Sequence, residues 1–291
     1  MPYQNTHLSA GLYFVATPIG NARDITLRAL DVLASAEVLA AEDTRSLRKL
    51  MEIHGIPLDG RHIIAYHDHN GEKARPRLMG LLAEGRSVAY ASEAGTPLVA
   101  DPGFVLAREA IAAGYPVTSA PGPSAMIAAL TIAGLPSDRF LFAGFPPASA
   151  GARRTFFATW EAVPATIGFY ESPKRIQRTL EELRDLYGAD RPVALCRELT
   201  KRFEEVLRGS IAEVLAQLEE RTLKGEIVLL VARAEAREMA AEDLDAAIDA
   251  ALENGTVKDA AAEIAKRHGL KRRDVYQRAL ARAKEREDGE A

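Results

Sequence analysis

Loops rich in proline, glycine and polar residues follow each of five apolar segments near the start of the chain. They are residues 17–21 (TPIGN), 41–44 (AEDT), 67–70 (HDHN), 92–97 (SEAGTP) with 101–103 (DPG), and 121–125 (PGPSA). Any one of them is compatible with an ordinary tight turn. Together they favour a ligand site, because Gly95, Gly103 and Gly122 lack a Cβ and let the backbone approach a bound molecule. None has a phosphate-cradling pattern, so we expect an unphosphorylated nucleoside or amino-acid moiety.

Five titratable side chains in these and later loops are candidate general bases, namely His67, Asp68, His69, Glu171 and Glu198. We expect His67 and Glu171 to be catalytic, and a histidine is attractive because its reference pKa lies near neutrality. Each candidate has a structural alternative. The His-Asp-His run would order its loop or cap the next helix, and Glu198 would form a surface ion pair with its basic neighbours.

The motifs of the common cofactor classes are absent from the sequence. There is no Gly-x-Gly-x-x-Gly fingerprint, no Gly-Lys dipeptide of a P-loop, no His-Glu-x-x-His and no Cys-x-x-Cys. The sequence therefore does not support an ordinary dinucleotide-binding domain, a P-loop NTPase or a zinc site of the usual spacing.

Strand-like segments alternate with helical patterns over the first part of the chain. The patterns predict strands at residues 12–16, 38–41, 63–66, 88–92 and 117–120, and helices near 26–34, 46–54, 72–84 and 104–113. This alternation predicts a mainly parallel sheet with right-handed crossovers. Ligands of such sheets bind beyond the carboxyl ends of the strands, where these loops fall. Glu42 and Asp43 are also candidate caps of a helix that begins near Thr44, with Arg45 as partner.

The pattern changes at residues 135–150, where three prolines and several small residues predict a linker. Beyond it we expect helices at 155–160, 176–187 and 211–218, and strands at 166–170, 193–196, 203–207 and 227–231. The short connections predict a mixed sheet. The expected domains are an α/β domain over 1–134, a second α/β domain over 135–232, and a C-terminal helical module over 233–291.

The C-terminal segment is rich in Ala, Glu, Lys and Arg. Thr256 followed by Asp259 resembles a capping box. Gly269 separates a helix at 261–268 from one at 273–283, as in a helix-turn-helix. Residues 266–273 (KRHGLKRR) carry five Lys or Arg and no acid, which favours contact with phosphates, although cations are also common at the carboxyl ends of helices.

Composition limits the class of protein. The chain has 291 residues, of which 47% are hydrophobic and 27% charged, so it can bury a sizeable core. Its formal charge of −4 means that any nucleic-acid site is a local patch. The single cysteine, Cys196, excludes an intrachain disulfide and favours a reducing compartment. No apolar run approaches a membrane span, so a cytoplasmic protein is expected.

Taken together, these loops resemble those of the tetrapyrrole methylase-like superfamily and, within it, the S-adenosylmethionine-dependent cytidine 2′-O-methyltransferases of 16S ribosomal RNA. Further strings extend the resemblance, namely 134–140 (GLPSDRF), 169–173 (FYESP), 197–201 (RELTK) and 224–226 (KGE). It covers residues 11 to about 231, and the C-terminal helices are of the same type. Glu93 is a variation, since an aspartate is common there in such proteins.

The resemblance implies a two-domain class III methyltransferase of α/β fold, usually a homodimer, with S-adenosyl-L-methionine in the cleft between the two halves. It implies cofactor contacts at Pro18, Glu93, Ala94, Gly95, Thr96, Leu98, Ser124, Ala125, Tyr170, Gly225, Glu226 and Ile227. No metal is expected, because methyl transfer from a sulfonium needs none.

The implied reaction is methylation of the 2′-oxygen of cytidine 1402 in 16S ribosomal RNA, within the small ribosomal subunit. The resemblance and the local charge make basic residues near the linker, near the 170–173 loop and in the C-terminal module the expected RNA contacts. They are Arg153, Arg154, Lys174, Arg175, Lys266, Arg267, Lys271, Arg272 and Arg273. One alternative is a tetrapyrrole C-methyltransferase of the same fold, acting on a corrin or sirohaem precursor. Another is a non-catalytic nucleic-acid-binding protein.

Overall fold

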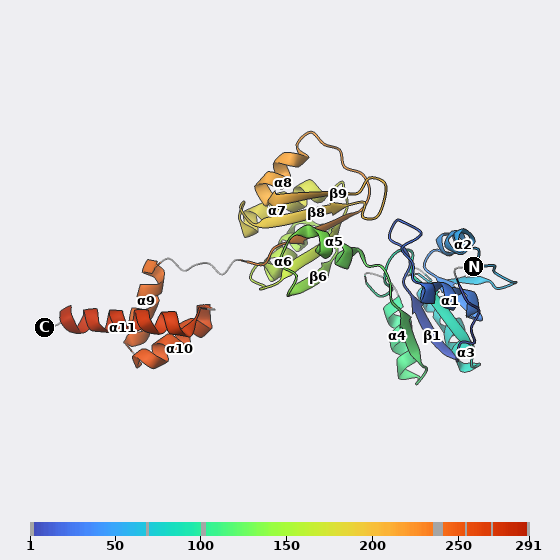
Figure 1. The fold of residues 1–291 in the computed structure, drawn as a ribbon, viewed down its shortest axis with the longest axis horizontal. Coiled ribbons are helices and arrows are strands. Elements are labelled where there is room, and N and C mark those ends of the chain that lie inside the picture. The colour runs from blue at the N-terminus through green and yellow to red at the C-terminus, as the bar shows by residue number, and fades with distance from the viewer. Residues whose placement is uncertain are drawn as a thin grey trace. The chain divides into compact units, whose positions relative to one another are not determined.

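A computed structural model describes residues 3–67, 70–99, 103–234, 241–253, 255–268 and 270–289 (Figure 1). The chain packs as two compact units, Met1–Ala232 and Arg233–Ala291. Within these described residues, the first unit contains two five-stranded sheets and the second contains three helices. Because both sheets lie in one unit, the proposed boundary at 134/135 remains a prediction.

The first sheet is entirely parallel, as the alternating pattern predicts. Its strands are β1 (Gly11–Val15), β2 (Val38–Ala41), β3 (Ile63–Ala65), β4 (Ser87–Ala91) and β5 (Val117–Ala120), in the order β3-β2-β4-β1-β5. The crossover helices are α1 (Leu27–Ser35), α2 (Thr44–Ile53), α3 (Gly71–Ala83) and α4 (Gly103–Ala112).

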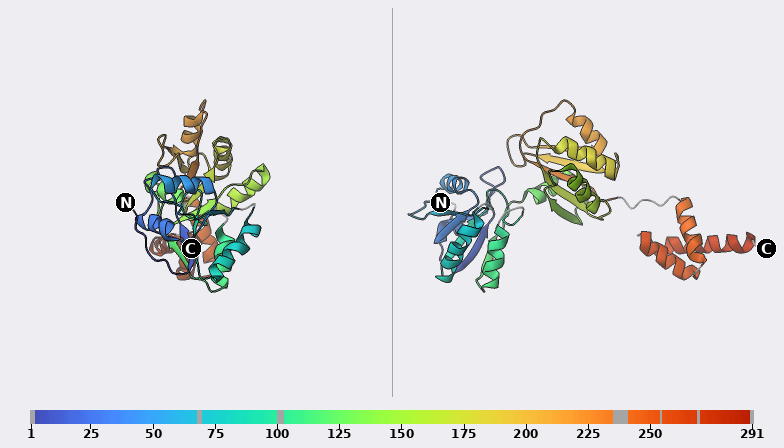
Figure 2. Two further views of the ribbon diagram at one scale, coloured as in Figure 1. Left: turned by 90° about the vertical axis from the view of Figure 1, so that its right-hand side faces the viewer. Right: turned by 180° about the vertical axis from the view of Figure 1, so that it is seen from behind.

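These helices cover both faces of the sheet, because successive side chains of a strand point to opposite faces. On β4, Ala89 and Ala91 pack with residues of α1 and α2, whereas Val88 and Tyr90 pack with residues of α3 and α4. Figure 2 shows this layering from two further directions. All five residues of β4 are buried, which accounts for a continuous apolar run in place of an alternating one.

Local caps fix where two of these helices begin. The Asp43 carboxylate accepts hydrogen bonds from the backbone N–H groups of Arg45 (2.8 Å) and Ser46 (3.4 Å), which confirms its role as the N-cap of α2. These bonds to backbone N–H groups, that of Arg45 foremost, hold the pKa of Asp43 below its ordinary value. Thr26 caps α1 in the same way through Ala29 N–H.

The second sheet is mixed, as expected, with the order β6-β7-β10-β8-β9. Its strands are β6 (Phe140–Gly144), β7 (Thr166–Glu171), β8 (Pro192–Arg197), β9 (Glu205–Ser210) and β10 (Ile227–Val231). The pair β6–β7 is parallel and the other pairs are antiparallel. Its helices are α6 (Ala150–Trp160), α7 (Ile176–Tyr187) and α8 (Ile211–Leu218), and α8 begins with a capping box between Ser210 and Glu213.

Two elements of the first unit were not predicted, and neither was the helix at Ala241–Leu252 in the second. The expected linker at 135–150 contains β6, because its prolines lie on either side of the strand and not within it. Helix α5 (Ala125–Ala133) is apolar on nearly every side, so it lacks the polar stripe that marks a helix in a sequence. Its Met126 and Leu130 pack with Cys196 and Val228 of the second sheet, although α5 directly follows β5 of the first.

The segment 203–207 was expected to be a strand, but β9 begins only at Glu205. Residues 201–204 instead form a turn, in which the Glu204 N–H donates to the Lys201 carbonyl at 3.1 Å. Phe203 is consequently exposed and does not start a buried strand.

The C-terminal unit comprises α9 (Ala241–Leu252), α10 (Val257–His268) and α11 (Arg272–Gly289). Ile248, Ile264 and Val275 are in its small buried core. Two ion pairs, Arg278–Asp245 and Arg282–Asp249, join α11 to α9. Thr256 accepts a hydrogen bond from the Asp259 N–H as predicted, but the Asp259 carboxylate accepts from the Thr256 hydroxyl. Among the described residues, no helix is long and apolar enough to cross a membrane.

Candidate active site

A cleft of about 550 Å³ lies in the first unit, between loops of the first sheet and loops of the second. This volume is in the range of sites that bind cofactors and other small molecules. The walls combine glycine-rich backbone, apolar side chains and a few polar groups. The lining residues are Ile19, Glu42, Glu93, Ala94, Gly95, Thr96, Val99, Ser124, Ala125, Phe145, Tyr170, Glu171, Ser172, Pro173, Arg175, Cys196, Leu199, Gly225, Glu226, Ile227 and Val228.

On the side of the first sheet, three loops are hydrogen-bonded to one another. Thr17 and Gly95 exchange both backbone hydrogen bonds at 3.0 Å, which joins the loop after β1 to the loop after β4. The Ser92 hydroxyl donates to the Gly95 carbonyl at 2.8 Å, and the Thr96 hydroxyl donates to the Pro123 carbonyl at 2.8 Å, in the loop after β5. Gly95 has a φ of +84°, a conformation that favours glycine.

On the side of the second sheet, two hydrogen bonds join the segment before β10 to Glu198. The Glu198 N–H donates to the Glu226 carbonyl at 2.9 Å, and the Glu226 N–H donates to Glu198 Oε1 at 3.0 Å. Gly225 has a φ of +94°, and a Cβ there would lie 2.4 Å from Glu198 Cδ. This wall therefore requires glycine at position 225 for both its backbone conformation and its close packing.

Lys201 completes this set of contacts. Its Nζ lies 2.8 Å from both Glu198 Oε1 and Glu226 Oε2. The hydrogen bond from Lys201, with that from the Glu226 N–H, holds the pKa of Glu198 below its ordinary value. Glu198 is thus an ion-paired carboxylate that shapes the wall, which is the structural alternative to a role as general base.

Aromatic and apolar groups form the rest of the cleft. The ring of Tyr170 lies 4.6 Å from that of Phe142 and 5.4 Å from that of Phe145, between ring centroids. Burial raises the pKa of the Tyr170 phenol. Burial also raises the pKa of the Cys196 thiol to about 11, so the thiol is not a nucleophile near neutral pH.

Most of the residues expected to bind the cofactor line this cleft. Glu93–Thr96, Ser124, Ala125, Tyr170 and Gly225–Ile227 do so, whereas Pro18 and Leu98 do not. Leu98 instead has a positive φ of 70° in the loop after β4. Ile19, Phe145 and Leu199 line the cleft without having been predicted, and as isolated apolar residues next to loops they carry no sequence signal of a site.

His67 is not among the residues that line the cleft. Its N–H donates to Asn70 Oδ1 at 2.8 Å, and its carbonyl accepts from the N–H groups of Asn70 and Gly71, where α3 begins. This arrangement favours the alternative in which His67 orders its loop. Asp68 and His69 lie outside the described residues.

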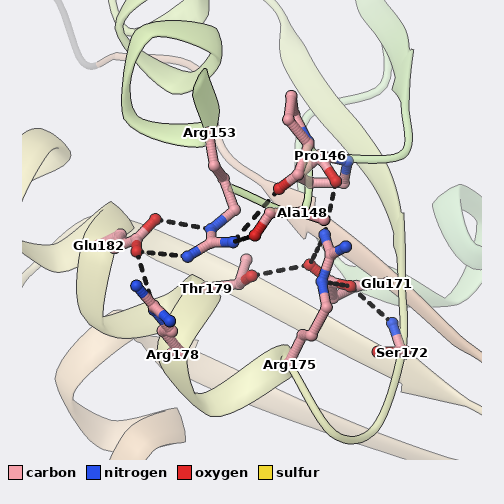
Figure 3. A network of polar contacts seen from close by, with 10 residues as sticks. Pro146, Ala148, Arg153, Glu171, Ser172, Arg175, Arg178, Thr179 and Glu182 are labelled. Atoms are coloured by element: carbon pink, nitrogen blue, oxygen red, sulfur yellow. Dashed lines mark hydrogen bonds and ion pairs between the residues drawn. The ribbon is translucent and has the colours of Figure 1, made fainter. Parts of the chain in front are cut away.

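Glu171 lines the cleft, but its carboxylate is bonded to its own neighbourhood (Figure 3). It lies 2.9 Å from Arg175 Nε and accepts hydrogen bonds from the Ser172 N–H and the Thr179 hydroxyl, both at 2.7 Å. The carboxyl side chain is only 2% exposed. Its contacts orient Arg175, whose Nη2 also donates to the Pro146 carbonyl.

Arg153 was expected to contact RNA, and the structure corrects this. Its side chain is 2% exposed and pairs with Glu182 through two hydrogen bonds of 2.7 and 2.6 Å. It also donates to the carbonyls of Pro147 and Ala148 (Figure 3). A side chain with these partners holds the 146–148 segment against α7 and is not accessible to a polyanion.

The other predicted RNA contacts fall into two groups. Arg154, Lys174, Lys271, Arg272 and Arg273 are exposed, and Arg175 is partly exposed at the cleft. The side chains of Lys266 and Arg267 lie outside the described part of the structure. Among the described residues, no group of three His, Cys, Asp or Glu is arranged to hold a metal ion.

The sequence matches known families over both units. Residues 11–215 match the family of Tetrapyrrole (Corrin/Porphyrin) Methylases, and residues 238–283 match the RsmI C-terminal HTH domain. The ribosomal RNA small subunit methyltransferase I of Mesorhizobium japonicum is 45% identical over 94% of this chain and 92% of its own length. The protein of that name from Escherichia coli O157:H7 is 44% identical over 96% of this chain and 98% of its own. The chain belongs to the ribosomal RNA small subunit methyltransferase I family.

Solved structures show the same fold at lower identity. The methyltransferase CobJ superposes with a TM-score of 0.61 at 20% identity, over 78% of this chain and 95% of its own. The cobalamin biosynthetic enzyme cobalt precorrin-4 methyltransferase superposes with a TM-score of 0.57 at 16% identity, over 76% of this chain and 94% of its own. These likenesses confirm the expected α/β fold with two sheets.

The Arg153–Glu182 pair predicts a large loss of stability on truncation. Glu182→Ala leaves the buried guanidinium without its counter-ion and lowers the free energy of unfolding by about 3 kcal/mol. Arg178→Ala removes the other, 61% exposed partner of Glu182 and costs at most about 1 kcal/mol. Urea unfolding at pH 7 measures the free energy of unfolding of both variants against that of the wild type.

The same pair predicts a pH dependence of that loss. The hydrogen bond from Arg153 holds the pKa of Glu182 below its ordinary value of 4.5. The stabilisation is therefore complete above pH 4.5 and is lost as the pH falls through the folded-state pKa. The difference in free energy of unfolding between the wild type and Glu182→Ala therefore narrows in acid. An equal difference at pH 7 and at pH 3 contradicts a lowered pKa of Glu182 as its cause.

Proposed function

We propose that this chain transfers the methyl group of S-adenosyl-L-methionine to the 2′-oxygen of a cytidine in 16S ribosomal RNA, at the position equivalent to 1402. The observation that carries the proposal is the match of nearly the whole chain, C-terminal unit included, to relatives named ribosomal RNA small subunit methyltransferase I. We place this activity in the cytoplasm, where small ribosomal subunits are assembled.

The cleft suits this cofactor chemically. S-adenosyl-L-methionine joins a nucleoside to an amino acid and carries no phosphate, and the cleft that would hold it is walled by the ordered, glycine-containing loops at Gly95 and Gly225. Glu42 and Glu93 line the same cleft, so a carboxylate environment faces a cofactor with a cationic sulfonium and an ammonium group. Tyr170 and Ile227 provide apolar surface.

Alignment is the main contribution expected of the protein. The sulfonium supplies a methyl group that is already activated, so the residues of the cleft chiefly have to hold the acceptor ribose in line with it. Arg175 is fixed by Glu171 and lies at the cleft, where its guanidinium can bind a phosphate next to the acceptor ribose. Glu171 acts in this scheme by orienting Arg175.

Two observations bear on the tetrapyrrole alternative. The solved structure of cobalt precorrin-4 methyltransferase shares the fold at 16% identity, which is no guide to the substrate. The match of residues 238–283 to a helix-turn-helix domain favours RNA, since a small-molecule enzyme has no need of such a unit.

The C-terminal unit is the proposed electrostatic contact to RNA. Lys271, Arg272 and Arg273 are exposed at the beginning of α11, which follows α10 as a recognition helix follows the first helix of a helix-turn-helix. Arg278 and Arg282 on the same helix are already paired with aspartates of α9.

We further propose a homodimer, as the resemblance implies. Phe104 and Ile111 lie seven residues apart on α4, and they are 58% and 62% exposed. Residues at this spacing share one helix face, so α4 presents two exposed apolar side chains there, with the Arg108 guanidinium 5.7 Å from the centroid of the Phe104 ring. A second copy could cover this face. Light scattering of the purified protein determines the mass of the particle and decides between one copy and two.

Methyl transfer to ribosomal particles tests the function directly. Labelled S-adenosyl-L-methionine is incubated with small subunits from a strain that lacks the endogenous enzyme, and the RNA is then hydrolysed in alkali. A 2′-O-methyl group blocks cleavage at its own phosphodiester, so we expect one labelled, alkali-resistant cytidine dinucleotide. Label transferred instead to a tetrapyrrole precursor supports the alternative, and binding of the subunits without transfer of label indicates a binding protein.

The Gly225 wall predicts a specific effect on cofactor binding. The Cβ of Gly225→Ala would overlap Glu198, so this variant binds S-adenosyl-L-methionine at least about 10-fold more weakly, as measured by calorimetry. Gly188→Ala is the matched control, because Gly188 also has a positive φ, of 91°, but has open space around it. The proposed cofactor site is wrong if the two variants bind the cofactor equally well.

The basic start of α11 predicts a change in salt dependence. Replacing Lys271, Arg272 and Arg273 with Gln removes three phosphate contacts and lowers the slope of log K against log salt by about 2. Lys284→Gln, an exposed cation further along α11, leaves the slope within error. Filter binding of the 16S RNA over a range of salt concentrations provides both values, and an unchanged slope in the triple variant contradicts the contact.

A further inference from the structure

An exposed aromatic ring on the turn 201–204 has no role in the fold. Arg202 and Phe203 are the two central residues of this turn, and Phe203 is 63% exposed. The guanidinium of Arg202 lies over the ring, 5.4 Å from its centroid. A large apolar side chain at a turn tip stays in contact with water and gains no packing energy in the folded chain, so this pair suggests a surface for a partner.

The turn is held firmly at its base. The Lys201 N–H donates to the Glu198 carbonyl at 3.0 Å, and the Thr200 N–H donates to Glu204 Oε2 at 2.6 Å. Glu198 and Thr200 both have positive φ values, 51° and 63°. Non-glycine residues in this conformation are strained, and they persist where the surroundings fix them, often at functional sites.

This anchored turn lies at the edge of the cleft. Leu199, at its base, lines the cleft, and Lys201 bonds to Glu226 in the cleft wall. On the other side it contacts the loop after β1. The Asn21 N–H donates to the Thr200 hydroxyl at 3.2 Å, and a Cβ on Gly20 would lie 2.5 Å from Lys201 Cγ. The turn therefore joins the two sides of the cleft, and Phe203 lies four residues beyond Leu199, which lines it.

We propose that Phe203, with Arg202, is a stacking platform for an unpaired nucleobase of the RNA beside the methyl-accepting ribose. This rests on the proposed function. Sequence-specific recognition of RNA mostly targets single-stranded nucleotides, whose bases are unstacked. Exposed aromatic rings and arginine planes are the groups that receive such bases. Phe203 acts here as a positioning residue.

Substitutions that separate aromatic character from bulk test this. Phe203→Ala and Phe203→Leu are compared with Phe203→Trp in steady-state methylation of small subunits, with far-UV circular dichroism as a check of folding. We expect the Ala and Leu variants to lose about 5- to 100-fold in kcat/KM for the subunit, mainly through KM. The Trp variant stays within about 3-fold of wild type, and cofactor affinity by calorimetry is unchanged in all three.

Phe140→Ala is the matched control, since Phe140 is also exposed (46%) but lies away from the cleft. Phe140 is at the start of β6, beside the start of the parallel strand β7, whereas the residues of β7 that line the cleft are at the end of that strand. A Phe203→Leu variant with the kcat/KM of wild type overturns the platform. A loss of kcat/KM that is accompanied by an equal loss of cofactor affinity overturns it too, because the change then affects the cofactor site and not only the RNA. A wild-type protein that methylates no subunit overturns the proposed function and the platform with it, whereas an active wild type with an equally active Phe203→Ala overturns the platform alone.

Discussion

The backbone pair between Thr17 and Gly95 is the contact on which the cleft depends. Parallel strands β1 and β4 end side by side, and their loops would diverge if nothing connected them. The exchange of two hydrogen bonds between these loops, extended by Ser92 and Thr96, fixes three loops as one surface before a ligand is present. Loops that are already ordered lose little conformational entropy on binding, which leaves more of the interaction energy for affinity.

Charged groups near the cleft follow a related constraint. A buried carboxylate or guanidinium is tolerated only with a partner, because desolvation of an unpaired charge costs several kcal/mol. Glu171 is paired with Arg175, Glu198 with Lys201 and Arg153 with Glu182. Glu171 and Glu198 therefore shape and orient the site. This arrangement favours chemistry with an activated donor, in which alignment matters more than proton transfer.

The sequence predicts some parts of this structure much better than others. The first sheet follows from its alternating pattern, because every strand is separated from the next by a helix. Helix α5 is not predicted because it has no polar stripe, and strand β6 is not predicted because prolines on either side of it indicate a linker. The glycines indicate the loops of the cleft in the sequence, but nothing indicates that Ile19 and Leu199 line it. An apolar residue in a cleft cannot be told from one in a core by its type and neighbours alone. The burial of Arg153 depends on Glu182, 29 residues away, and no local pattern indicates that pairing.

The shared fold leaves the choice of substrate to other parts of the chain. A cleft of about 550 Å³ is on the scale of a small-molecule site, so most of the affinity for a long polyanion has to arise elsewhere. Contacts from Lys271, Arg272 and Arg273 to phosphates would supply affinity, but phosphate contacts do not distinguish one sequence from another. Selection of a single ribose then has to come from the rim of the cleft, where a base is either received or rejected. Arg175 lines the cleft and is held by Glu171, and the proposed platform Phe203 lies on the anchored turn that follows Leu199 in the chain. Such firmly held groups discriminate because a misplaced nucleotide cannot be accommodated by movement of the protein.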